Sequence, residues 1–120
     1  MTDEEFNALV EAAYNSLPDA VKNLADFPGI SILAEPPESI LKEKNFSPGK
    51  ELLGCFTGLT RAKESWSIIE RTPRLIFVFK GPIERCSRGN LPEEIKRVVW
   101  HEVAHWLGHS TEEEVRQLGL

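Results

Sequence analysis

The chain has 120 residues and a formal net charge of −5, with 19 acidic and 14 basic side chains. This length suits a single core, so we expect one domain over residues 1–120. An acidic chain with dispersed basic residues does not suit nucleic acid or an anionic membrane, so we expect neither as a partner. The acidic first residues and the lack of a long apolar run predict a cytoplasmic protein. In that reducing compartment Cys55 and Cys86 are expected to be free thiols.

Two helices are predicted at the start of the chain. Thr2 and Glu5 form a capping-box pattern, and apolar residues then recur at helical spacing, which predicts a helix to about Ser16. Pro18 suits the first residue of a second, short helix that ends before Pro28. We expect both helices to contribute core packing and no chemistry.

Three strands are predicted in the middle of the chain, at residues 30–34, 52–57 and 74–79. The third is apolar on both faces, so we expect it to be central in a sheet or covered on both sides. Gly54 in the second strand indicates a bulge or a close approach of another backbone. The polar or Gly- and Pro-bearing stretches between elements are expected to be surface connections, the first with no more than a loose helical turn. These connections span residues 35–50, 58–67 and 82–89.

The helix that begins after Asn90 carries the most informative stretch of the chain. Asn90 suits an N-cap, and apolar residues keep helical spacing until Gly108, which suits the helix end. Within this helix His101, Glu102 and His105 form a His-Glu-x-x-His pattern. Residues i and i+4 share a helix face, so both imidazoles can hold one divalent cation, Zn²⁺. The carboxylate of Glu102 is then directed beside the metal, as in the general base of a zinc hydrolase.

Three stretches of the chain, taken together, resemble a known family. They are Leu52-Leu53-Gly54, the run from Pro73 to Arg85 that ends in Pro-Ile-Glu-Arg, and the run from Val98 to Gly108. They resemble the small bacterial zincin-like metallopeptidases, sometimes called minimal zincins, and the likeness extends over nearly the whole chain. It implies an α+β fold in which a small mixed β-sheet packs against the helix with the His-Glu-x-x-His motif. It also implies zinc at the positions of His101 and His105, with Glu102 as general base.

A catalytic zinc site needs a third protein ligand. The family often has an aspartate three residues after the motif glycine, but Thr111 stands there, and a threonine hydroxyl is a poor zinc ligand. Glu112, one residue further on, is our first candidate because a carboxylate binds zinc well. His109 and Glu113 are the alternatives. The glutamates also suit the first turn of a last helix capped by Ser110 or Thr111.

These features predict a zinc-dependent metallopeptidase whose substrate is a peptide or an unfolded protein segment. A chain of 120 residues has no second lobe to enclose a folded substrate, so we expect an extended one, added along a sheet edge beside the motif helix. The negative charge that develops on the carbonyl oxygen during hydrolysis also needs a partner. Tyr14, His109 and the arginines all remain candidates for it. Two alternatives also stay open: a zinc-binding interaction module without catalysis, and a structural domain whose histidines bind nothing.

Overall fold

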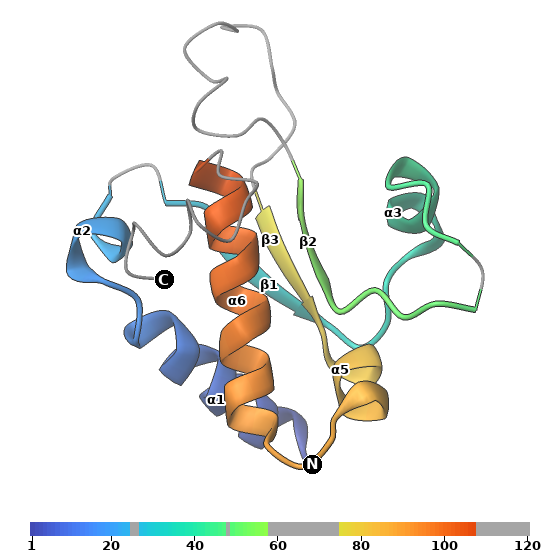
Figure 1. The fold of residues 1–120 in the computed structure, drawn as a ribbon, viewed down its shortest axis with the longest axis horizontal. Helices are drawn as coiled ribbons and strands as arrows, with labels where there is room; N and C mark the ends of the chain where they lie inside the picture. The colour runs from blue at the N-terminus through green and yellow to red at the C-terminus, as the bar shows by residue number, and fades with distance from the viewer. Residues whose placement is uncertain (25–26, 48, 58–74, 108–120) are drawn as a thin grey trace, which may run out of the picture.

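The structure, a computed structural model, describes residues 1–24, 27–47, 49–57 and 75–107. Helices on both faces of a small sheet make up this part of the chain (Figure 1). No described helix combines the length and apolar character needed to cross a bilayer. The elements, in chain order, are α1 (Asp3–Asn15), α2 (Asp19–Lys22), β1 (Gly29–Leu33), α3 (Glu38–Glu43), β2 (Gly54–Thr57), β3 (Leu75–Phe79), α5 (Lys80–Cys86) and α6 (Leu91–Leu107).

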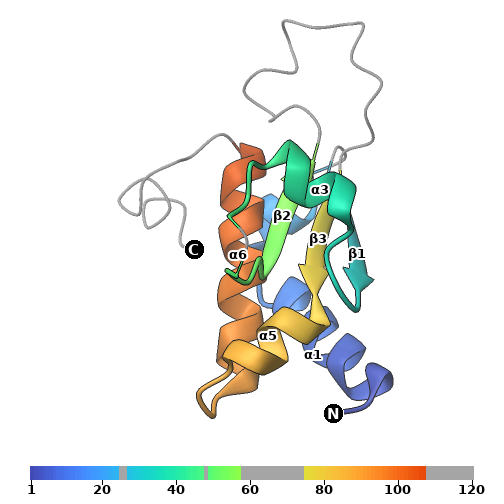
Figure 2. The ribbon, with the colours of Figure 1, turned by 90° about the vertical axis from the view of Figure 1, so that its right-hand side faces the viewer.

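The sheet has three strands in the order β1-β3-β2. β1 runs parallel to β3, and β2 runs antiparallel to it. The small mixed sheet and the central position of the third strand are therefore both confirmed. β2 lies at one edge of the described sheet, on the side where α6 passes (Figure 2).

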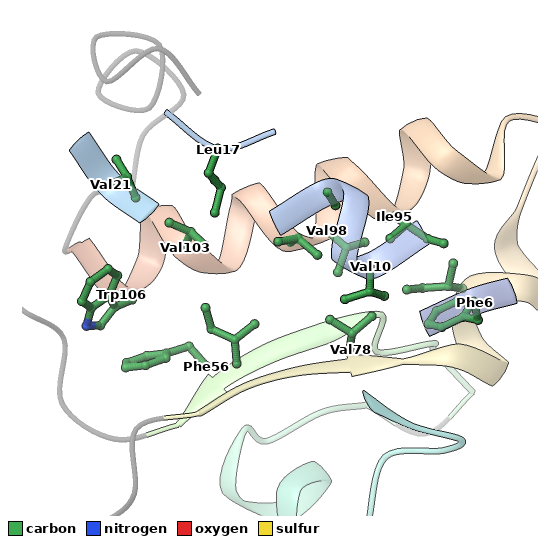
Figure 3. Packing of buried hydrophobic residues seen from close by; sticks show 14 residues of the cluster. Phe6, Val10, Leu17, Val21, Phe56, Val78, Ile95, Val98, Val103 and Trp106 are labelled. Atoms are coloured by element: carbon green, nitrogen blue, oxygen red, sulfur yellow. The ribbon is translucent and has the colours of Figure 1, made fainter. Parts of the chain in front are cut away.

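Alternation along β3 divides the core between the two faces of the sheet. Ile76 and Val78 belong to the larger cluster, which they form with residues of α1, α2 and α6 (Figure 3). Phe79 belongs to a smaller cluster with Cys55 and with Ile40 of α3. α6 therefore packs on one face of the sheet, and α3 covers the other.

The helix α1 begins as predicted, with the side chains of Thr2 and Glu5 forming a capping box. It packs along α6 through a buried apolar face that includes Phe6 and Val10. The indole nitrogen of Trp100 on α6 adds a polar contact, donating to Ala13 O at 3.3 Å and to Ser16 Oγ at 3.1 Å. This contact links α6 to the C-terminal end of α1.

Two of the predicted surface connections are wrong, because each contains a helix. α3 occupies residues 38–43, where Ile40 is buried against the sheet. α5 begins directly after β3 at Lys80, and its Pro82 and Ile83 are buried. Pro82 suggested a turn, but proline is also tolerated in the first turn of a helix, and buried side chains stabilise helices too short to persist alone. The predicted connection at 58–67 lies outside the described residues.

Candidate metal centre

α6 presents His101 and His105 on an exposed face, one helical turn apart. Asn90 Oδ1 accepts from the backbone N–H of Glu93 at 3.3 Å, so Asn90 caps the helix as predicted. The ring Nε2 atoms of the two histidines lie 2.9 Å apart, and the ring planes are inclined by 80°. This separation is that of a hydrogen bond between the two rings, with the donor set by the tautomer, and it places both nitrogens on the same side of the helix.

The closeness of the two nitrogens is compatible with a shared zinc ion that would replace this hydrogen bond. Two imidazole nitrogens bound to one tetrahedral zinc, each at 2.0–2.1 Å, would lie about 3.3 Å apart. The separation of 2.9 Å between the Nε2 atoms of His101 and His105 is shorter by only a few tenths of an ångström. Burial lowers the pKa of His105, and the positive charges of His101 and Lys44 act in the same direction. A lowered pKa favours the neutral imidazole, which is the form that binds a metal.

Glu102 lies between the two histidines in sequence but points to the protein interior, with only 7% of its surface exposed. It is directed at β2, where the backbone of Gly54 makes room for it. A Cβ atom added to Gly54 would lie 3.6 Å from Glu102 Cγ and 2.8 Å from both Val98 Cγ1 and Phe77 O. The prediction that Gly54 marks a close approach is confirmed, and this approach brings the motif helix against the edge strand.

Burial raises the pKa of Glu102 to about 7, and the positive charge of Lys44 opposes this rise in part. A carboxyl group with a pKa near neutrality can both accept and return a proton at physiological pH. The buried setting of Glu102 therefore suits a group that transfers protons beside the two histidines.

Lys44 is the residue near this site that sequence reasoning missed. It follows α3, and its ammonium donates to the backbone carbonyl of Phe56 on β2 at 2.7 Å. In the sequence it belongs to a charged run, Lys42-Glu43-Lys44, which has the composition of a solvated surface. Only the packing of α3 on the sheet brings it to β2, so no sequence signal could have identified it.

The comparison with known families agrees with this arrangement. The chain matches the model of the zincin-like metallopeptidase family over residues 28–120. It belongs to that family. No curated protein shows significant similarity to the chain.

No candidate for a third metal ligand lies among the described residues. Glu112, His109 and Glu113, the three candidates from the sequence, lie outside them, as does Thr111. Within residues 1–24, 27–47, 49–57 and 75–107, no three His, Cys, Asp or Glu side chains are grouped to hold a metal.

The remaining candidates from the sequence lie elsewhere in the fold. Cys55 is buried and Cys86 exposed, and both are free, as predicted. Tyr14 packs edge-on against Phe27, with ring centroids 5.3 Å apart. Both aromatic residues line a hollow of about 360 Å³ between α1 and β1. Nothing in these contacts connects Tyr14 with the two histidines.

Proposed function

We propose that this member of the zincin-like metallopeptidase family is a zinc-dependent peptidase, with His101 and His105 as zinc ligands and Glu102 as general base. The observation that supports this most is the closeness of two Nε2 atoms, 2.9 Å apart, on the same helix turn as a carboxyl group whose pKa burial raises to about 7. A purely structural helix gains little from Glu102, because a buried carboxyl group that has no ion pair among the described residues is costly.

When bound at this position, zinc supplies Lewis-acid activation of water and of the scissile carbonyl group. Glu102 accepts a proton from the water molecule whose oxygen adds to the carbonyl carbon. The same carboxyl group then donates that proton to the leaving nitrogen as the C–N bond breaks. The raised pKa of Glu102 suits both transfers, because neither the acid nor the carboxylate form is strongly disfavoured near pH 7.

The free edge of β2 is where we propose that the substrate lies. Within the described part of the chain, β2 pairs with β3 on one side only, and we call its other side the free edge. α6 packs against β2 with Glu102 close to Gly54. An extended peptide added antiparallel or parallel to such an edge forms main-chain hydrogen bonds without a deep cleft. Peptides and unfolded segments can adopt this extended form, which is why we propose them as substrates.

The decisive experiment replaces Glu102 by glutamine, which keeps the shape of the side chain and removes its basicity. We expect Glu102→Gln protein to retain about one zinc per chain by elemental analysis. Cleavage of a peptide library should fall by roughly 10²–10⁴-fold. Undiminished cleavage by the variant would reject Glu102 as base. A wild-type protein that holds zinc and cleaves no library member would instead support a zinc-binding module without catalysis.

We propose Glu112 as third zinc ligand, on the chemistry of its carboxylate and its position shortly after the motif. Under this proposal Glu112→Ala should weaken zinc binding by at least about tenfold in a competition titration with a chelating dye. His109→Ala and Glu113→Ala provide the matched comparison, since a larger effect in either would transfer the role to that residue.

A further inference from the structure

Lys44 is held in a defined position beside the candidate site. It caps the C-terminus of α3, where Asn45 adopts a left-handed conformation with φ of 52°. The N–H of Phe46 donates to Leu41 O at 2.9 Å, and that of Asn45 to Lys42 O at 3.1 Å. These two bonds form a Schellman motif, which fixes the chain direction at the end of a helix. The Lys44 side chain therefore leaves from a well-determined point and reaches β2.

The carbonyl that Lys44 binds faces the free edge of β2. Because Phe79 N–H donates to Leu53 O, the hydrogen-bonded pairs with β3 involve Leu53 and every second residue after it. Gly54 and Phe56 lie between those pairs, so their backbone groups point away from β3. Lys44 Nζ donates to Phe56 O at 2.7 Å and so occupies one of the acceptors at this edge.

Lys44 and Glu102 thus lie at neighbouring positions of the same edge. Glu102 approaches Gly54, and Lys44 binds at Phe56, two residues and about 7 Å further along the strand. Through-space effects agree with this placement, because the charge of Lys44 lowers the pKa of both Glu102 and His105.

The ammonium of Lys44 has no carboxylate partner among the described residues. Lys22, Lys42 and Lys80 each pair with a described acidic side chain, whereas the hydrogen-bond partner of Lys44 is a neutral carbonyl. An ammonium has three N–H donors, and the bond to Phe56 uses one. Among the described residues, two of its donors have no partner at this end of β2, in a protein of net charge −5.

We propose that Lys44 determines substrate specificity by binding the terminal carboxylate of a short peptide that lies along the free edge of β2. This inference rests on the proposed peptidase function. Because Lys44 occupies Phe56 O, main-chain pairing along this edge ends at Phe56, where an anionic chain end meets a cation. A long segment running through the edge would instead have to displace the Lys44 bond.

A different role for Lys44 is purely structural. Lysines on edge strands often prevent pairing with other chains, and Lys44 satisfies that description as well. The two roles differ in what they predict for ligands: edge protection is indifferent to a carboxylate, whereas an anchoring cation prefers it over the uncharged amide.

The test measures, by calorimetry, the binding of three dipeptide probes to zinc-loaded protein. Each probe carries a zinc-binding hydroxamate at its N-terminal end. The C-terminal end is a free carboxylate in the first probe, an amide in the second, and an amide in the third, which also has an aspartate side chain. We expect the wild-type protein to bind the carboxylate probe roughly tenfold or more tightly than the amide probe.

Lys44→Met should abolish that preference and leave the affinity for the amide probe within about twofold of wild type, while Lys44→Arg should retain the preference for the carboxylate probe. Lys42→Met is the matched control, since Lys42 lies on α3 and pairs with Glu38 at 3.3 Å.

Each outcome decides the proposal. An unchanged preference in Lys44→Met would overturn it, and so would a preference for the aspartate probe over the terminal carboxylate. Failure of the proposed function is recognised separately, because wild-type protein would then either hold no zinc by elemental analysis after loading or hold zinc and cleave no member of the peptide library. Zinc-loaded protein that binds the amide probe but shows no carboxylate preference would reject the role of Lys44 alone.

Discussion

Glu102 on α6 and the pair Glu35 and Glu51 beside α5 carry the same side chain in opposite environments. Glu102 is 7% exposed, and burial raises its pKa to about 7. Glu35 and Glu51 are solvent-accessible and each accept two hydrogen bonds from Arg85, at distances from 2.6 to 2.9 Å. Those bonds hold the pKa of both carboxyl groups below its ordinary value.

The difference separates carboxyl groups that hold the fold from one that suits chemistry. A carboxylate paired with a guanidinium stays ionised over a wide pH range and exchanges no protons near neutrality. A buried carboxyl without an ion pair costs stability, and a fold keeps one mainly where a proton has to move. The α5 corner and the α6–β2 contact should therefore respond differently to the same kinds of change.

The largest expected effect is on zinc binding at the α6–β2 contact. His105→Ala removes one of the two closely spaced nitrogens, so zinc affinity should fall by roughly a hundredfold or more, given that even supporting residues contribute 10–100-fold. Arg85→Met, at the other region, should leave zinc affinity within about twofold. A chelator competition titration measures both. Equal losses in the two variants would mean that zinc responds to the whole fold and not to this pair.

The next effect concerns the pH dependence of stability in metal-free protein. The pKa of Glu102 is raised from 4.5 to about 7, so its favourable contribution is complete below pH 4.5 and is lost as pH rises through 7. That loss amounts to about 3 kcal/mol. Urea unfolding in the presence of a chelator, at pH values from 5 to 8.5, should show wild type losing stability relative to Glu102→Gln. The comparison with the variant cancels contributions from His101, His105 and Lys44. Parallel pH profiles would contradict the raised pKa.

A smaller effect is expected from changes to glycines at the sheet. A Cβ atom at Gly54 would lie 2.8 Å from the Phe77 carbonyl, which cannot move away easily, so Gly54→Ala should cost about 1–3 kcal/mol. Gly29→Ala is the matched control, because its nearest neighbour is the flexible Leu75 Cδ2 at 3.3 Å. Thermal or urea unfolding would distinguish them. Similar losses of stability in both variants would show that the close contact at Gly54 is no less tolerant of a Cβ atom than the contact at Gly29.

The smallest effect belongs to the α5 corner. Arg85→Met removes the guanidinium group that pairs with two exposed carboxylates, so we expect a modest loss of stability at pH 7. The pKa of Glu35 and of Glu51 is lowered, so the stabilisation is present above their ordinary pKa and disappears as pH falls through the lowered values. Wild type and Arg85→Met should therefore become equally stable in acid. A difference that persists at pH 2 would assign the effect to packing of the arginine stem.

The site was predictable from the sequence where its geometry is local. His101 and His105 meet because helical periodicity alone places residues four apart on one face, and the caps and apolar spacing of α6 identify that helix. Gly54 was predicted to mark either a bulge or a close backbone approach, and the structure shows the close approach. The central position of β3 was predicted, as one of two possibilities, because this strand is apolar on both faces.

What could not be predicted depends on contacts between distant segments. Lys44 reaches Phe56 only because α3 packs on the sheet, and α3 itself resembled a solvated connection. The raised pKa of Glu102 likewise depends on the closeness of β2 and not on the residues beside it in sequence. α5 was missed because Pro82 suits a turn and a first helical turn equally well.

Arg85 forms ion pairs with Glu35, which follows β1, and with Glu51, which precedes β2. These two glutamates lie at the two ends of the segment that contains α3 and Lys44. The ion pairs therefore hold the two ends of this segment together, as a disulfide holds the two ends of a loop. Salt screens such exposed pairs, so ionic strength should control how often the two ends of this segment separate. Amide hydrogen exchange in α3 should then accelerate as salt is added, while the buried amides of α6 keep their protection.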